Sequence, residues 1–468
     1  MVFSSVLFLV FFFPVFFTVY FLFPNYLKNL WALFASIVFY IWGGSDFFLI
    51  LCASICVDFI LMHIMDSKEG NFRLILALFS VIFNFCILGY FKYADFFVEN
   101  WNFLLQKNFP LPKIILPIGI SFFTFHKVSY TIDIYYKKSK PLKKISDYLL
   151  YILLFPQLIA GPIIRFNEIR DQILDRKNLE NWDNRLKGLI RFCIGLARKV
   201  LIANVLGKEA DKIFSLNEPE LSFFLAWMGI LAYTFQIYFD FAGYSDMALG
   251  LGKMMGFQFP ENFQFPYTSG SITEFWRRWH ITLGNWMRDY IYIPLGGNLV
   301  SKFQTYLNLW AVFLFSGLWH GASWNFVFWG AYHGLFISLE KFFKSPKEKE
   351  KKNFTKVLKM IFTFFLILNG WVLFRSDSLS IALGMWKAMY FPKTFGNFTV
   401  DAYFLFFFFL SCIFSFYPIF KPLKKYMDLE SYITKYPKLF VFISIILYSL
   451  SLGELLSTNF NPFIYFRF

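Results

Sequence analysis

The chain has 468 residues, of which 57% are hydrophobic and 70 are phenylalanine, and its formal net charge is +15. A soluble domain is only about half apolar and does not carry many uninterrupted apolar runs. Here, runs such as VLFLVFFFPVFFTVYFLF and FFLILCASICVDFILMHIM match the roughly 20 residues that cross a bilayer core. The composition excludes an ordinary soluble globular protein and predicts a polytopic membrane protein.

The positive charge does not indicate nucleic-acid binding. Lys and Arg cluster between apolar segments, and the aromatic–basic platforms that nucleic acids need are missing. Cytoplasmic loops of membrane proteins collect Lys and Arg, and anionic lipid headgroups attract them. We therefore expect the bilayer, and no nucleic acid, as a partner. The basic stretches that mark candidate cytoplasmic faces lie at 137–144, 165–199, 341–352 and 421–438.

The apolar segments predict an all-α membrane protein of about a dozen transmembrane or re-entrant helices. No internal repeat is visible, so we expect a single membrane-embedded domain over 1–468. Within it we distinguish N-terminal helices at 1–115, a core at 116–340 and C-terminal helices at 341–468. The apolar segments lie near 5–23, 27–42, 46–65, 74–91, 114–131, 146–164, 187–205, 221–241, 303–340, 355–374, 402–420 and 439–456.

Two of these segments should not form simple spans. The segment at 146–164 contains Pro156 and the pair Gly161-Pro162, which interrupt a helix. Such a break suggests a re-entrant segment, because broken backbone at membrane depth must be satisfied by protein or water. The segment at 303–340 would run about 57 Å as one helix, well beyond a core of about 30 Å. We predict that it breaks at the HGAS of residues 320–323.

His320 is the first candidate for chemistry. An ionisable side chain at membrane depth tends to face a cavity or a partner. Trp319 and Trp324 flank it and are candidate pocket residues, and small residues such as Gly317 and Gly321 could open space beside it. The alternative is a neutral histidine that is hydrogen-bonded between helices. The predicted helix break, the small neighbours and a second histidine favour a chemical role.

That second histidine is His280, on a predicted amphipathic helix. The spacing places His280 with an apolar stripe on one helix face. Glu274 can pair with Arg278 one turn on, and Ser271 or Thr273 can cap the start. By spacing alone, His280 could equally be a packing residue. The stripe consists of Ile272, Phe275, Trp276, Trp279, Leu283, Trp286, Met287 and Tyr290.

The other polar candidates are weaker. We expect structural roles for His63, His126 and His333. Asp240 ends an apolar run and is a candidate pocket residue, with Tyr238, Tyr244 or an arginine as its partner. No phosphate loop, GxSxG elbow, HExxH pair, calcium loop or Gly-Asp-Ser nucleophile motif is present. The five cysteines lie in or beside apolar segments without metal-ligand pairing, so we expect no metal site.

Taken together, ITEFWRRWHITLGNWMRDYIYIPLGGN and LFSGLWHGASWNFVFWGAYHG resemble the signature of the membrane-bound O-acyltransferase family. The chain is most similar to the bacterial branch that contains alginate and peptidoglycan O-acetyltransferases. The resemblance runs from about residue 116 to the last residue. One departure is His126, where the family pattern has glutamine. The supporting stretches are LPIGISFFTF, FPQLIAGPIIRF, YTFQIYFDFAGYSDMALGL, GFQFPENFQFPY and the terminal FIYFRF.

The resemblance implies an all-helical fold in which tilted helices surround a central funnel. It implies that His320 is the catalytic histidine and His280 its partner position. It also implies a cytoplasmic acyl donor, acetyl-CoA, with no permanently bound cofactor, and a polysaccharide acceptor outside the membrane. An extracytoplasmic esterase-like protein of the SGNH type commonly completes the transfer in this branch. The expected location is the bacterial cytoplasmic (inner) membrane.

The residues are compatible with this chemistry. A neutral imidazole can take the proton from an attacking hydroxyl. Arg198 and Lys199 abut an apolar segment and could bind the phosphates of acetyl-CoA as it enters, although positive-inside topology explains them as well. Two alternatives stay open: D-alanyl transfer to teichoic acid by a related protein, and a polysaccharide flippase. A flippase predicts paired broken helices in related halves, and the sequence has no such halves.

Overall fold

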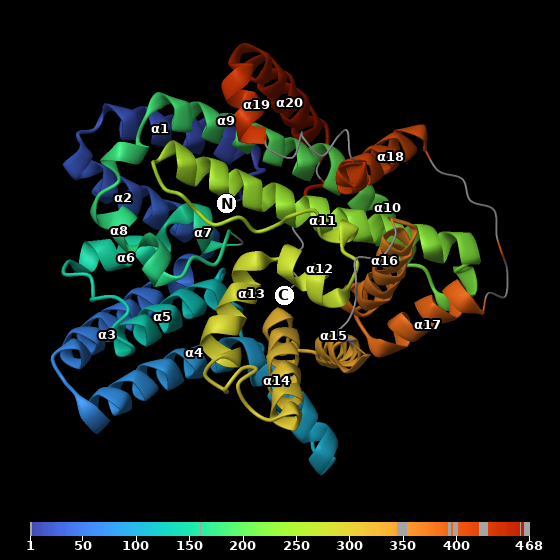
Figure 1. The fold of residues 1–468 in the computed structure, drawn as a ribbon, viewed down its shortest axis with the longest axis horizontal. Coiled ribbons are helices and arrows are strands. Elements are labelled where there is room, and N and C mark those ends of the chain that lie inside the picture. The colour runs from blue at the N-terminus through green and yellow to red at the C-terminus, as the bar shows by residue number, and fades with distance from the viewer. Residues whose placement is uncertain are drawn as a thin grey trace. The chain divides into compact units, whose positions relative to one another are not determined.

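The computed structural model describes residues 2–159, 161–343, 353–391, 395, 401–420, 429–458 and 460–462. All regular elements in this part of the chain are helices (Figure 1). Seven of these helices are long and apolar enough to cross a membrane. The prediction of an all-α polytopic membrane protein is confirmed.

The chain divides into two compact units. Unit 1 comprises Met1–Phe192 and Met247–Pro260. It holds η1 (Phe8–Phe12), α1 (Phe13–Leu22), α2 (Asn25–Gly44), η2 (Ser45–Phe47), α3 (Phe48–Asp66), α4 (Gly70–Leu105), α5 (Ile120–Tyr135), α6 (Ile145–Leu153), α7 (Phe155–Leu158), α8 (Phe166–Leu174), η3 (Lys177–Leu179) and most of α9 (Trp182–Ala197).

Unit 2 comprises Cys193–Asp246 and Glu261–Phe468. It holds η4 (Arg198–Ala203), α10 (Asn204–Phe214), η5 (Glu218–Glu220), most of α11 (Phe223–Met254), η6 (Pro266–Thr268), α12 (Ile272–Arg278), α13 (Ile281–Met287), η7 (Arg288–Tyr292), α14 (Lys302–His320), α15 (Trp324–Phe343), α16 (Asn353–Arg375), α17 (Leu379–Tyr390), α18 (Ala402–Phe416), η8 (Tyr417–Ile419), α19 (Leu429–Lys435) and α20 (Pro437–Ser457).

Both predicted breaks are present. The segment at 146–164 forms α6, turns at Leu154, forms the short α7 and then leaves the helical conformation. The segment at 303–340 forms α14 and α15, separated by residues 321–323. In lipid every backbone polar group must be satisfied within the protein, so most of the apolar length stays helical and the breaks are local.

The α15 helix returns against α14 (Figure 1), and two glycines allow the contact. A Cβ atom on Gly317 would lie 2.2 Å from the carbonyl oxygen of Phe326. A Cβ atom on Gly330 would lie 2.3 Å from the carbonyl oxygen of Phe313. Our expectation that the small residues open space is therefore wrong at Gly317. It is wrong at Gly321 too, since the ring of Phe326 lies 2.2 Å from where its Cβ atom would be.

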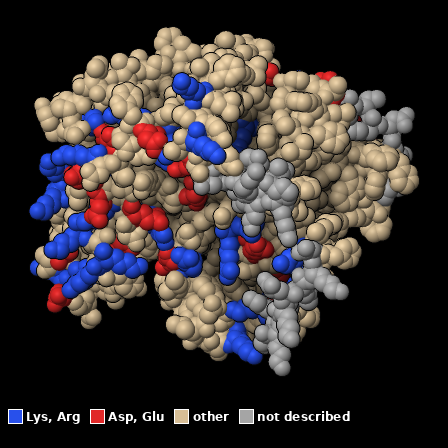
Figure 2. Space-filling model, turned by 45° about the horizontal axis from the view of Figure 1, so that its top comes forward, with Lys and Arg blue, Asp and Glu red and all other residues tan. Residues whose placement is uncertain are grey.

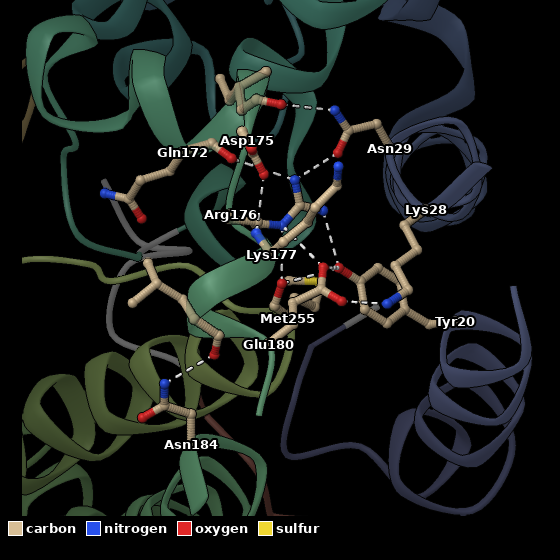
Figure 3. Close-up of polar contacts among 12 residues, drawn as sticks. Tyr20, Lys28, Asn29, Gln172, Asp175, Arg176, Lys177, Glu180, Asn184 and Met255 are labelled. Atoms are coloured by element: carbon tan, nitrogen blue, oxygen red, sulfur yellow. Dashed lines mark hydrogen bonds and ion pairs between the residues drawn. The ribbon is translucent and has the colours of Figure 1, made fainter. Parts of the chain in front are cut away.

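Unit 1 contains a buried charged cluster (Figure 3). Lys28 of α2 pairs with Glu180, which follows η3. The Tyr20 hydroxyl lies 3.0 Å from Glu180 Oε1 and 2.9 Å from the carbonyl oxygen of Met255. Arg176 donates to that same carbonyl oxygen and to the Tyr20 oxygen, both at 2.9 Å. The cluster thereby ties α1 and α2 to the segments that follow α8 and α11.

The surface has the character of a membrane protein. Figure 2 shows a face on which Lys and Arg side chains gather in one part while wide areas carry no charge. The lysines of the basic stretch at 137–144 are exposed. Large apolar side chains are exposed along the candidate spans, among them Phe79 of α4, Phe406 of α18 and Phe442 of α20. The basic stretches at 344–352 and 421–428 and the terminal FIYFRF lie outside the described residues.

Glu180→Gln should destabilise the protein strongly. The change leaves Lys28 and Arg176 buried without their carboxylate, and breaking a buried pair in this way costs about 3–5 kcal/mol. A lower Tm of the purified protein in detergent would show this loss. Glu69→Gln is the matched control, because Glu69 and Lys137 form an exposed pair, and exposed pairs contribute little. Equal Tm values for the two variants would contradict the assignment.

Gly330→Ala should force α14 and α15 apart. Backbone atoms cannot rotate away from the new methyl group, and overpacking of this kind costs about 1–3 kcal/mol. Gly453→Ala on α20 is the matched control, since a Cβ atom there meets nothing within 4 Å. The control should be neutral or stabilising by up to about 1 kcal/mol. Thermal unfolding checks both, and a Gly330→Ala protein as stable as the control would refute the close helix contact.

Candidate functional site

His320 is the last residue of α14 and is only 4% exposed. Gly321 follows it in an extended conformation, with φ −168° and ψ 149°, so the helix ends at the imidazole. Three aromatic rings surround that imidazole. Their centroids lie 4.9 Å (Trp319), 5.0 Å (Trp329) and 5.1 Å (Phe374) from that of His320. As predicted, His320 stands at a helix end inside the protein.

His280 does not lie on a continuous helix, so our prediction there is wrong. The α12 helix ends at Arg278, and His280 adopts a left-handed conformation with φ 44° before α13 begins. Asn262 satisfies the start of α13, because its backbone oxygen accepts from the Ile281 N–H at 3.0 Å and its side-chain oxygen accepts from Thr282. The segment that precedes α12 thus supplies the acceptors that a continuing helix would have provided.

The local details of this segment are otherwise as expected. The Ser271 side chain caps α12 by accepting from the Glu274 N–H at 3.0 Å. Glu274 pairs with Arg278 at 2.5 Å. Most of the predicted apolar stripe is buried, with Trp276 the partly exposed member. The stripe stays buried because the turn at His280 keeps the apolar residues of the two short helices on the inner side.

The two histidines share a neighbour. The Trp319 ring centroid lies 6.1 Å from that of His280 and 4.9 Å from that of His320. His280 is buried and also packs edge-on against Phe241 at 4.6 Å. His280 lies outside the seven candidate spans, and burial lowers its pKa to about 3. It is therefore a neutral imidazole at ordinary pH.

Asp240 has a lysine as its partner. Its Oδ1 atom lies 2.6 Å from Lys199 Nζ, and both side chains are almost fully buried. Lys199 also donates to Asn204 Oδ1 at 2.8 Å and to the carbonyl oxygen of Pro462. We had expected Tyr238, Tyr244 or an arginine to fill this position. No local pattern indicates this pairing, because Lys199 lies in a separate segment.

The two residues predicted to bind phosphates and the two tryptophans predicted to line the pocket lie in different environments. The donors of Lys199 already face three acceptors, which speaks against its predicted role in phosphate binding. Arg198 is about one-third exposed and pairs with Asp246. Trp319 belongs to the buried cluster at His320, whereas Trp324 is 52% exposed at the start of α15.

His333 lies near His320, with Trp329 between them. Its ring centroid is 4.9 Å from that of Trp276 and 5.0 Å from that of Trp329, and Trp329 also contacts His320. The turn at 321–323 brings α15 back along α14 and so places His333 near this cluster. The other two histidines lie in unit 1. His63 Nδ1 lies 2.8 Å from the Phe59 carbonyl oxygen, and His126 packs near Tyr151.

Metal binding finds no support in the described residues, where no group of three or more His, Cys, Asp or Glu side chains could hold an ion. The chemistry available at His320 is that of a buried imidazole among aromatic rings. A neutral imidazole can accept a proton, and indole N–H groups can donate hydrogen bonds to an oxygen.

Comparisons with known proteins agree with this chemistry. The sequence model of the membrane-bound O-acyltransferase family matches residues 124–381, which include both His280 and His320. The chain is 43% identical to a probable alginate O-acetylase of Azotobacter vinelandii, over 86% of this chain and 80% of that protein. It is 38% identical to the peptidoglycan O-acetyltransferase of Helicobacter pylori, over 83% and 80%.

More distantly, the chain is 27% identical to the teichoic acid D-alanyltransferase of Bacillus subtilis, over 68% of this chain and 89% of that protein. The family model covers more than half of the chain, and the stronger relatives are aligned along most of their length. The chain belongs to the membrane-bound O-acyltransferase family and is an acyltransferase.

Proposed function

We propose that this acyltransferase takes an acetyl group from cytoplasmic acetyl-CoA and serves the O-acetylation of a polysaccharide outside the membrane, such as an alginate-like polymer or peptidoglycan. The observation that carries the proposal is the buried imidazole of His320 at the broken end of α14. The names of the relatives that are 43% and 38% identical to the chain support acetyl transfer to these polymers.

In the proposed reaction, His320 is the general base. It takes the proton of the acceptor hydroxyl while the hydroxyl oxygen attacks the thioester carbonyl carbon. The carbon–sulfur bond then breaks, and the proton passes from His320 to the leaving thiolate. The products are an acetyl ester and a free thiol, so atoms and charge balance. A well-placed base of this kind contributes roughly 10²–10⁴-fold to the rate.

His280 is proposed as the partner of His320. Its support is the shared contact with Trp319, whose ring lies within 6.1 Å of both imidazoles. A neutral second imidazole can orient the acceptor or hold its hydroxyl by a hydrogen bond. Trp319 packs edge-on against His320, and its ring is tilted by 50° to that of His280.

The proposal also names a residue that binds acetyl-CoA and a protein that receives the acetyl group. Arg198 is the candidate for the phosphates of acetyl-CoA, because its guanidinium is partly exposed and suits phosphate oxygens. Lys199 could bind these phosphates only if its ion pair with Asp240 were broken. An SGNH-type esterase-like protein outside the bacterial inner membrane would receive the acetyl group and pass it to the polymer. The chain itself has no Gly-Asp-Ser nucleophile motif for that second step.

D-alanyl transfer is the second candidate function, since the Bacillus subtilis relative is named for it. The identity of 27% to that protein, against 43% to the alginate O-acetylase, favours acetyl. Neighbouring genes would separate the two: an esterase-like partner accompanies acetylation, and a carrier protein with its adenylating enzyme accompanies D-alanylation. The flippase alternative is set aside, because the chain is an acyltransferase.

His320→Ala should abolish polysaccharide acetylation while leaving the amount of membrane protein unchanged. Without the base, the rate should fall by at least about 100-fold. The measurement is ester-linked acetate on each isolated envelope polysaccharide from a deletion strain that carries either the wild-type or the variant gene.

His63→Ala is the matched control for this experiment. His63 is a partly buried histidine of α3 that contacts a backbone carbonyl oxygen, so its loss should leave acetylation near the wild-type level. Full acetylation with His320→Ala would refute the base. Unchanged acetate on every polymer of the deletion strain would refute the acetyl assignment itself.

A further inference from the structure

The aromatic cluster beside His320 contains buried polar atoms that no described residue satisfies. They are Nε1 of Trp276, Nε1 of Trp329 and both ring nitrogens of His333. Native proteins pair nearly all buried polar groups with protein, water or ligand. Leaving one unpaired costs about 1–3 kcal/mol. Several such atoms lie together in this cluster, where a bound group could accept hydrogen bonds from them.

The three side chains contact one another. Ring centroids are separated by 5.4 Å for Trp276–Trp329, 4.9 Å for Trp276–His333 and 5.0 Å for Trp329–His333. Trp329 also contacts His320 at 5.0 Å, with the two ring planes at 84°. Of the three rings, Trp329 therefore adjoins His320 directly, and Trp276 and His333 adjoin Trp329. All of these residues lie in unit 2.

The helix packing creates this arrangement. Trp276 comes from α12, and Trp329 and His333 come from α15 one turn apart. Gly370 of α16 leaves room for the imidazole, since a Cβ atom there would lie 2.8 Å from His333 Nε2. A side chain at position 370 would displace His333 from the two indoles. The ring triangle is thus held from three helices.

The hydrogen-bond donors of the three side chains indicate which kind of ligand atom they would bind. An indole N–H only donates, and a neutral imidazole has one N–H donor. The two indoles are uncharged, and so is the imidazole of His333 when it is neutral. They suit a carbonyl oxygen, which is neutral in the substrate and becomes negative when its carbon is attacked. Donors placed where charge develops are a principal source of enzymatic rate acceleration.

We propose that Trp276, Trp329 and His333 form the oxyanion subsite for the thioester carbonyl oxygen, an inference that rests on the proposed acetyl transfer. Attack on the carbonyl carbon moves the electron pair of the C=O π bond onto oxygen, where the three N–H groups stabilise it. The pair returns to the C=O bond when the carbon–sulfur bond breaks. The three side chains neither gain nor lose a proton.

The test removes one N–H group at a time. Trp329→Phe and Trp276→Phe keep an aromatic ring but lose the donor, His333→Phe loses the imidazole N–H, and His333→Gln restores an N–H donor. Release of CoA from acetyl-CoA is measured in membranes that contain the full-length chain and its acceptor. We expect kcat to fall about 10²–10³-fold for each lost donor with KM for acetyl-CoA little changed. His333→Gln should recover much of the rate.

Two tryptophans supply matched controls in unit 2. Trp386 of α17 also has a buried Nε1 atom that no described residue accepts from, and Trp227 of α11 donates to the Met389 carbonyl oxygen at 3.1 Å. Trp386→Phe and Trp227→Phe should leave kcat within about threefold of wild type, since neither indole is a proposed donor to the oxyanion. Protein amount and Tm of every variant separate a lost donor from a lost fold.

A dithioester analogue of acetyl-CoA, in which sulfur replaces the carbonyl oxygen, gives a second readout. Sulfur is a weak hydrogen-bond acceptor, so the analogue should slow the wild type more than it slows Trp329→Phe. Equal slowing in both proteins, or a wild-type kcat in Trp329→Phe and His333→Phe, would overturn the subsite and leave water as the occupant. A fully active His320→Ala protein would instead overturn the proposed function.

Discussion

The contact between α14 and α15 is the constraint on which the site depends. At Gly317 and Gly330 the backbone of one helix occupies the space that a side chain would fill on the other. Because the helices meet this closely, Trp329 of α15 reaches the imidazole that ends α14. Any side chain at either glycine would move Trp329 relative to His320. These two glycines therefore influence the candidate site by letting the two helices pack closely, and they open no cavity beside His320.

Much of the fold follows from the membrane. Apolar length and the need to satisfy every backbone group in lipid predict helices and their breaks, and both breaks are present. The turn at His280 was not predictable from periodicity, because residues on both sides of it still point inward. The pairing of Lys199 with Asp240 and the approach of His333 to Trp329 depend on which segments pack together. No local pattern in one sequence records such packing.

Both units bury charged side chains as ion pairs. Ion pairs such as Lys199–Asp240 in unit 2 and Lys127–Asp58 in unit 1 are almost fully buried, at 2.6 and 2.9 Å. Burying an ion pair costs desolvation energy that only additional hydrogen bonds offset. Both pairs have these bonds: Asn204 accepts from Lys199, and Ser80 and Asn84 donate to Asp58.

In the proposed reaction, by contrast, His320 carries a charge only while it holds the proton of the acceptor. Once His320 accepts a proton it becomes a cation, and aromatic faces within about 6 Å can stabilise a cation by up to about 2 kcal/mol. The centroids of Trp319 and Trp329 lie at 4.9 and 5.0 Å. The aromatic surroundings are therefore compatible with the proposed role of His320 as a base that accepts a proton and then returns it.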